Sequence, residues 1–311
     1  MPPSHPRSPS SAHNVRANAH NAQAIAVWAA RLLWLVLALA GGGAFGGALA
    51  SHSRGVQVVG TAALWVGWGA AALALAIPST VSLTVARTVA PMALAGAVCA
   101  AVAGGATATQ STLAIGLAAV ATVAIATGEF GQRFAQGSAY GDEQRFVLRP
   151  PVVALIAVAV TWPMLCAGAL ASPLLLGAAN WVLGVPVLLL TTGAGWVLGQ
   201  RYHRLSRRWL VIVPAGVVVH DHVVLAETVM LAAANVTSLH LALAGTDAAD
   251  LTGPASGNAV EVTVRDLVTV VFAGTRGTPQ GTAIHAGGML VAPSRPGAML
   301  QAAADRRLPV G

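Results

Sequence analysis

The stretch from about Ala24 to Gly199 consists of long apolar runs separated by short breaks, and the first 128 residues contain no Asp or Glu. A water-soluble protein cannot keep that much continuous apolar surface in solution, whereas a bilayer requires it, since each spanning helix needs about 20 apolar residues. Only 9% of the 311 residues are charged, against roughly 25% in soluble domains. The sequence therefore predicts an α-helical integral membrane protein.

The apolar runs predict about six transmembrane helices within a domain that covers residues 23–200. Their expected ranges are 24–50, 56–77, 85–104, 111–127, 152–171 and 179–199. The first run has a rival interpretation, because Ala48-Leu49-Ala50 resembles a small-residue signal-peptidase site. The long polar region before this run, and Arg31 within it, favour a retained helix. Residues 1–22, rich in Pro, Ser, His and Asn, predict a disordered cytoplasmic tail.

The arginines give the orientation of the bundle. All 17 basic residues are arginine, and cytoplasmic loops carry the arginine excess of a membrane protein. One side of the predicted bundle has Arg54 alone, and the other collects Arg7, Arg16, Arg87, Arg133, Arg145, Arg149, Arg201, Arg204, Arg207 and Arg208. This pattern predicts a multi-pass protein of the cell membrane with both termini in the cytoplasm. The net charge of +7 comes from these scattered topology signals and does not indicate nucleic acid as a partner.

The chain changes character after Gly199. A juxtamembrane basic stretch comes first and is expected to anchor the topology and to touch anionic lipid headgroups; it holds Arg201, Arg204, Arg207 and Arg208. Short β-strands follow, with His220-Asp221-His222 expected at a hairpin turn. A terminal helix is expected after Ser294, which can act as its N-cap, with Pro296 in its first turn. The expected strands are residues 209–213, 217–220, 223–226, 228–231, 238–241, 259–264, 268–273 and 283–291.

Strands followed by one helix, opened by RWLVIVPAGVVVHDHVVLAE and closed by APSRPGAML, resemble the bacterial pleckstrin-homology-like (PH-like) domains that are fused to membrane helices. The whole chain resembles uncharacterised multi-pass membrane proteins of actinobacteria that carry such a domain. The resemblance implies that residues 201–311 form a small cytoplasmic β-rich domain that binds or scaffolds. It supplies no catalytic positions.

The loop at residues 128–151 breaks the apolar pattern most sharply. Phe130 and Phe134 are one helical turn apart, so a short amphipathic helix on the membrane surface is one expectation. As a functional element, the loop would contact the C-terminal domain or a partner. As an ordinary connection, its aromatic side chains would rest at the membrane interface. The candidate interaction residues are Glu129, Phe130, Arg133, Phe134, Tyr140, Asp142 and Arg145.

Chemistry-bearing motifs are few. The sequence has no Gly-x-Ser-x-Gly, Walker-type loop or His-Glu-x-x-His motif, so neither catalytic residues nor cofactors are predicted. His220 and His222 alternate along the chain and would point the same way in a strand, which is compatible with a shared metal. No Cys or Glu stands beside them to complete a site, and we therefore predict no metal ligands.

These observations favour a non-enzymatic membrane protein that anchors a cytoplasmic PH-like interaction module. Its expected partners are the bilayer and other membrane or cytoplasmic proteins, with a homo-oligomer as a further possibility. A small-solute transporter or channel is the alternative, although ionisable residues mark such paths and only Arg31 and Arg87 come near the membrane interior. A membrane enzyme of lipid or envelope metabolism is the third hypothesis and would need its catalytic groups in the 128–151 loop.

Overall fold

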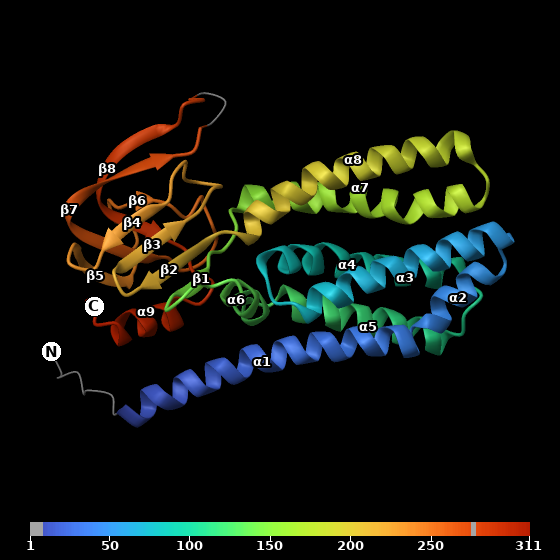
Figure 1. Cartoon of the computed structure of the whole chain (residues 1–311), viewed down its shortest axis with the longest axis horizontal. Coiled ribbons are helices and arrows are strands. Elements are labelled where there is room, and N and C mark those ends of the chain that lie inside the picture. Colours follow the sequence, from blue (N-terminus) through green and yellow to red (C-terminus); the bar gives the residue numbers. More distant parts are fainter. Residues whose placement is uncertain (1–8, 275–277) are drawn as a thin grey trace.

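The structure, a computed structural model, describes residues 9–274 and 278–311, with side chains described from Asn21 onward. Six helices in this part of the chain are long and apolar enough to cross a membrane. They form an elongated bundle with the β-strands gathered at one of its ends (Figure 1). The helical, multi-pass membrane part of the prediction is thereby confirmed.

The first span is made of two helices, α1 (Pro9–Ala40) and α2 (Gly42–Ala50), which break at Gly41. Because α1 begins at Pro9, the structure differs from the disordered tail predicted for residues 1–22, of which residues 1–8 lie outside the described part. The other spans are α3 (Arg54–Ala76), α4 (Thr80–Ala103), α5 (Ala108–Ala126), α7 (Val152–Gly177) and α8 (Trp181–Ser206).

Short polar caps set the starts of the spanning helices. The side chains of Ser53, Ser79 and Asn180 accept hydrogen bonds from the first turns of α3, α4 and α8. Thr107 and Gln110 form a reciprocal capping box at the start of α5. These caps satisfy N–H groups that would otherwise lack partners at helix ends.

Helix α4 lies inside the bundle, where it packs against α3, α5 and α8. The α7–α8 hairpin packs on α3 and α4, whereas α1 packs along α5. Two tryptophans tie α1 to α3 reciprocally, because the Trp34 Nε1–H donates to the Trp68 carbonyl and the Trp68 Nε1–H donates to the Trp34 carbonyl, each at 3.0 Å. These bonds satisfy indole donors that lipid could not satisfy.

The two arginines inside spans bond to the ends of neighbouring helices. The Arg31 guanidinium donates to the carbonyls of Leu75 and Ala76 at the end of α3. The Arg87 guanidinium donates to the carbonyls of Ile125 and Thr127 at the end of α5. A cation at a helix C-terminus also faces the negative end of the helix dipole. Both arginines therefore cap helices from within the bundle.

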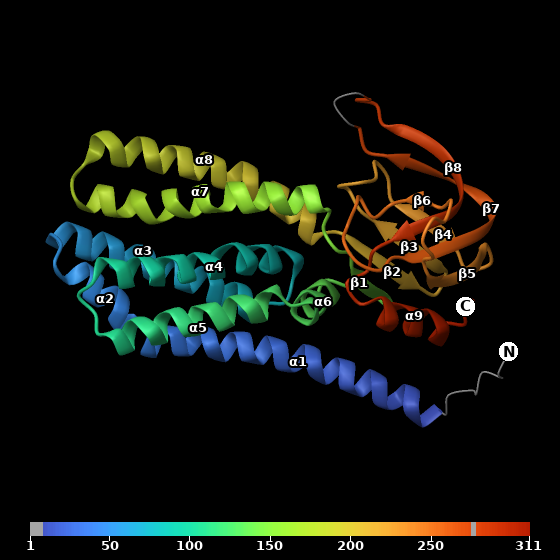
Figure 2. The same ribbon diagram turned by 180° about the vertical axis from the view of Figure 1, so that it is seen from behind.

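The chain returns to the same end of the bundle several times. The start of α1, the α3–α4 connection, helix α6 (Gly128–Gln136) and the strands lie at this end in both views (Figures 1 and 2). The α7–α8 turn and the α4–α5 connection lie at the opposite end. The arginine-rich segments therefore share one end, as the arginine count predicts.

In the part of the chain that the structure describes, the strands form two sheets of four strands each. The first has the order β1-β2-β3-β4, and all its neighbours pair antiparallel. Its strands are β1 (Gln144–Val147), β2 (Trp209–Val213), β3 (Gly216–His220) and β4 (Val229–Ala232). The second has the order β5-β7-β8-β6 and is made of β5 (Val236–Leu241), β6 (Ala249–Asp250), β7 (Val260–Phe272) and β8 (Thr282–Val291). The prediction of a β-rich C-terminal region is confirmed.

Several local expectations differ from the structure. Residues 223–226 form no strand, so His220-Asp221-His222 is not a hairpin turn. The two strands expected at 259–264 and 268–273 are one long strand, β7, whose register with β8 shifts between Thr263 and Val268. Strands β1 and β6 were not expected, because β1 lies in the loop and β6 has only two residues.

One apolar core joins both sheets and the terminal helix α9 (Pro296–Asp305). Leu210, Leu231, Leu239 and Val262 are fully buried in it, and Met299 reaches it from α9. The helix begins at Pro296 as expected, but Arg295 occupies the N-cap position and Ser294 makes no capping bond. Ser294 instead donates its backbone N–H to the carbonyl of Val147, the last residue of β1.

Candidate functional site

The loop at residues 128–151 joins the bundle to the sheets. Helix α6 directs Phe130 and Phe134 into the bundle, where both are fully buried and stack with ring centroids 4.3 Å apart. Helix α6 packs there against α1, α4 and α5. The expectation that these aromatic side chains rest at the membrane interface is therefore wrong, because they close the end of the bundle core.

The opposite side of α6 holds strand β1 through two glutamines. Gln132 accepts a hydrogen bond from the Val147 N–H and donates its amide to the Arg145 carbonyl. Gln136 accepts from the Arg145 N–H at 2.9 Å and donates to the Glu143 carbonyl at 2.8 Å. The two amides lie one turn apart on the helix and replace a neighbouring strand. They form hydrogen bonds with the backbone N–H and C=O groups on the edge of β1 that faces away from β2.

The charged residues of the loop contact the C-terminal domain. Asp142 pairs with Arg306 just after α9 at 2.6 Å, and Glu129 lies 3.8 Å from Arg295. The Arg145 guanidinium lies 4.8 Å from the centre of the Trp209 ring in β2, a cation–π distance.

The other two candidate residues of the loop point to solvent. Arg133 is exposed and the Tyr140 side chain is 91% exposed. The structure therefore divides the candidate residues into bundle contacts, domain contacts and two free surface positions.

A buried ion pair lies at the joint between α8 and the sheets. The Arg208 guanidinium donates to both Asp221 carboxylate oxygens at 2.7–2.9 Å, and both side chains have no exposed surface. Arg208 also donates to the carbonyls of Arg149 and Thr252, and Asp221 accepts from the Val223 N–H. The pair is thus saturated with hydrogen bonds, which a buried charge requires.

This pair changes the interpretation of the juxtamembrane basic stretch. Arg201, Arg204 and Arg207 are exposed at the end of α8 and remain available to anionic headgroups. Arg208 is wholly buried, so the expectation that it touches lipid is wrong. Its guanidinium is instead paired with the carboxylate of Asp221, the residue that follows β3.

His220 is the most perturbed titratable group of the sheets. Its ring stacks on Trp209 at 5.1 Å, and its Nδ1 lies 3.1 Å from the Thr228 hydroxyl. Burial first, and then the charges of His222, Arg207 and Arg145, lower the pKa of His220 to about 4, against the opposing effect of Asp221. His220 is therefore neutral at physiological pH. No group of three or more His, Cys, Asp or Glu side chains with the spacing of a metal site occurs in the described part of the chain.

A cavity of about 440 Å³ lies where the bundle meets the sheets; we call it the junction cavity. Its volume falls in the range of small-ligand sites, about 300–1,000 Å³. Helices α4, α5, α7 and α8, the first residue of α6, the β1–α7 connection and Ser294 all contribute to it. It is lined by Thr84, Arg87, Thr88, Pro91, Thr122, Ile125, Ala126, Gly128, Val147, Leu148, Arg149, Pro150, Leu155, Val158, Trp162, Tyr202, Leu205, Ser206 and Ser294.

The lining of the junction cavity is cationic. It includes Arg87 from α4 and Arg149 from the β1–α7 connection, and it includes no Asp or Glu. Burial lowers the pKa of Arg149 from its ordinary value. Two polar atoms around the cavity, Arg149 Nε and Ser294 Oγ, are buried without a hydrogen-bond partner among the described residues. These unsatisfied groups in a cationic cavity indicate a site for an anion.

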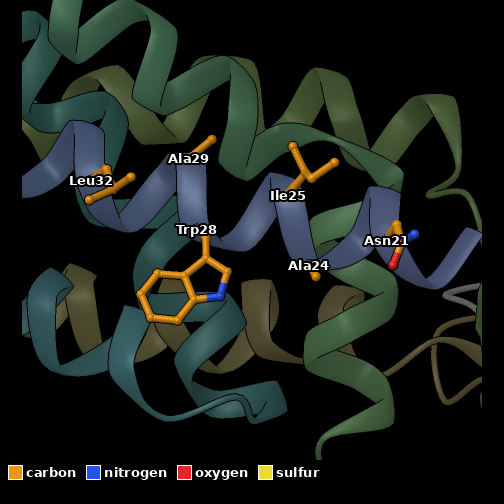
Figure 3. Close-up of a pocket in the computed structure, with 6 residues that line it drawn as sticks. All are labelled: Asn21, Ala24, Ile25, Trp28, Ala29 and Leu32. Atoms are coloured by element: carbon orange, nitrogen blue, oxygen red, sulfur yellow. The ribbon is translucent and has the colours of Figure 1, made fainter. Parts of the chain in front are cut away.

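A second hollow lies along α1 and has a different character. It is lined by residues of that helix alone, including the exposed side chains of Ile25, Trp28 and Leu32 (Figure 3). In Figure 3 the labelled side chains all belong to α1, and their i, i+3, i+4 spacing places them on one face of that helix. An exposed apolar face of this kind is what a membrane-spanning helix needs on the side that faces lipid.

Sequence reasoning missed the residues that join the two parts of the chain. The available signal was the pair Gln132 and Gln136, because amides one turn apart can bond to a strand edge. The partner of Arg208 lies 13 residues away, and the junction cavity gathers five helices with two connecting segments. Neither relation has a local sequence pattern.

No family model, no curated protein and no solved structure matches the chain.

Proposed function

We propose that this chain is a non-enzymatic protein of the cell membrane that anchors a cytoplasmic PH-like interaction module in a fixed position on six helices. The observation that carries the proposal is strand β1. It comes from the loop between spans, pairs with β2, and is held on its other edge by α6. The module is therefore built partly from the bundle, as a scaffold with a set orientation requires.

The arrangement of the sheets supports the PH-like assignment. Two four-stranded sheets share one apolar core with a helix that follows the last strand. The arginine distribution supports the cytoplasmic assignment. The three exposed arginines of the α8 end lie beside the module, where anionic lipid headgroups attract them.

Exposed apolar side chains on the module are available to a protein partner. Leu243 is 76% exposed and Leu267 is 67% exposed, and Tyr140 lies free on the loop that supplies β1. Tyrosine is among the side chains that are enriched at protein interfaces. We propose that other membrane or cytoplasmic proteins bind here.

A photoreactive amino acid placed at Tyr140, Leu243 or Leu267 of the full-length chain tests this proposal in native membranes. The expected result is a discrete protein adduct of the same mass from at least two of these positions. The control is Val102, which is 84% exposed near the opposite end of α4 and should give no such adduct. Absence of protein adducts from all three positions would contradict the scaffold proposal, as would solute flux in proteoliposomes that Arg87→Ala abolishes.

The orientation has its own test. The α2–α3 connection, which contains His52, and the α6–β1 connection, which contains Tyr140, lie at opposite ends of the bundle (Figure 1). Single cysteines at these two positions, in a chain carrying Cys99→Ser and Cys166→Ser, therefore report the two ends. A membrane-impermeant maleimide should label the His52 position in intact cells and the Tyr140 position only after lysis. The reverse pattern would place the module outside the cell and overturn the assignment.

A further inference from the structure

We propose that the junction cavity binds the phosphate of an anionic membrane lipid, with Arg87 and Arg149 as the cationic groups and Ser294 as a hydroxyl donor. The proposal goes beyond the scaffold function, because it assigns a ligand site to a cavity that the scaffold does not need. It is also separate from the exposed arginines of the α8 end.

Charge is the first argument. No ion pair involves Arg87 or Arg149 in the part of the chain that the structure describes. Arg87 donates hydrogen bonds to two carbonyl oxygens, at 3.3–3.4 Å. A guanidinium with such long bonds keeps donors for a bidentate oxyanion, and phosphate is the anion that arginine recognises best in this manner.

Unsatisfied polar atoms are the second argument. The Ser294 Oγ is buried without a hydrogen-bond partner among the described residues. It lies next to Gly128, where a Cβ atom would be 3.8 Å from it. Arg149 donates its Nη2 to the Asn258 carbonyl, while its Nε has no such partner. A buried donor that lacks a partner destabilises the structure, and a phosphate oxygen would accept from both types of donor.

Position and walls favour a lipid as the source of the phosphate. Arg87 is about 10 Å along α4 from its first residue, Thr80, which is near the depth where the headgroup region meets the hydrocarbon core. Apolar side chains of Leu155, Val158 and Trp162 from α7 form one wall, and Leu155 is 48% exposed. A headgroup can therefore enter while its acyl chains stay in the bilayer beside α7.

Binding to the delipidated full-length chain in neutral detergent tests the proposal by native mass spectrometry. The probes are phosphatidylglycerol, phosphatidylcholine and inorganic phosphate. We expect the first phosphatidylglycerol molecule to bind roughly tenfold more tightly than the first phosphatidylcholine molecule. This difference in affinity corresponds to about 1.4 kcal/mol. If millimolar inorganic phosphate displaces the bound phosphatidylglycerol completely, the cavity is a phosphate site whose ligand is soluble, and the assignment to a lipid is wrong. Equal binding of both lipids, with no effect of phosphate, would overturn the proposal.

Variants then locate the site. Arg87→Gln and Ser294→Leu should each weaken the first phosphatidylglycerol by about tenfold. Arg133→Gln and Arg265→Gln each remove an exposed arginine that lies outside the cavity, and should leave the binding of the first phosphatidylglycerol molecule unchanged. Val158→Trp fills the cavity without removing a charge and should also abolish binding, which keeps the test decisive if Arg87→Gln does not fold. If the control variants lose phosphatidylglycerol binding and the cavity variants retain it, the proposed location of the site is wrong.

Discussion

His220 makes the stability of the module depend on pH. Its pKa in the folded chain, about 4, lies below the ordinary value of 6.5, so the unfolded chain binds the proton more readily. The resulting stability is complete above about pH 6.5 and is lost as the pH falls toward 4. The cause is burial against Trp209 together with the nearby positive charges.

Replacing this histidine should reduce the acid sensitivity. We expect His220→Gln to lessen the fall in the free energy of unfolding between pH 7 and pH 4.5 by on the order of 1 kcal/mol, after a discount for its solvent-exposed half. Thermal unfolding of the detergent-solubilised chain, followed across this range, measures the effect. His285→Gln, on an exposed position of β8, is the control. If both variants lose stability as steeply as the parent, His220 is not the responsible group.

The residue scale also shows the limit of sequence analysis. Arg208 follows three exposed arginines, and nothing in its immediate neighbourhood distinguishes it from them. Its burial arises because β3 ends where Asp221 can reach back across the sheet. A pairing that depends on how two strands are aligned is invisible to a count of charges along the chain.

At the scale of elements, hydrophobicity made the spans predictable. Each expected range lies on an observed spanning helix, because about 20 apolar residues in succession have no other stable form in lipid. Helices α7 and α8 extend past their expected ends at residues 171 and 199. Helix α7 continues through Ser172-Pro173 into three leucines, whereas α8 continues into a polar segment that hydropathy alone does not assign to a span. Strand β1 was missed because QRFV is too short and polar to signal a strand without its neighbours.

The glutamines of α6 should be important for the join between bundle and module. Gln132→Leu leaves the Arg145 carbonyl and the Val147 N–H without their partners, which should cost about 2–4 kcal/mol. Hydrogen exchange should show faster exchange of the β1 amides, while the amides of α4 keep their protection. Gln301→Leu, on the exposed side of α9, provides the matched substitution. Unchanged protection of β1 in Gln132→Leu would show that pairing with β2 alone holds this strand.

For the whole molecule, the C-terminal region is not an independent unit. Residues 201–311 contain β2 but lack its neighbour β1, and they retain Arg208 without the carbonyl of Arg149. An isolated fragment therefore exposes an apolar strand edge that the full chain covers. The domain boundary placed at residue 201 by composition separates segments that the structure joins in one sheet.

This arrangement predicts the behaviour of two fragments. Residues 201–311 alone should aggregate or form dimers through the open edge of β2, as measured by size-exclusion chromatography with light scattering. A fragment that begins with residues 128–150 carrying Phe130→Gln and Phe134→Gln, joined to residues 207–311 by a flexible linker, should be monomeric and more stable. It restores β1 and does not expose the two rings that α6 buries in the bundle. A monomeric, cooperatively folded 201–311 fragment would show that β1 is dispensable.

The position of β1 in the chain also has a consequence for biosynthesis. Val147 leaves the ribosome about sixty residues before Trp209, its partner in the sheet, a delay of roughly 3–12 s at ordinary rates of translation. The α7–α8 hairpin is synthesised in this interval and must enter the bilayer before the two strands can meet. Pairing of β1 with β2 therefore follows insertion of the α7–α8 hairpin. A chain in which α7 and α8 fail to insert cannot complete the first sheet of the module.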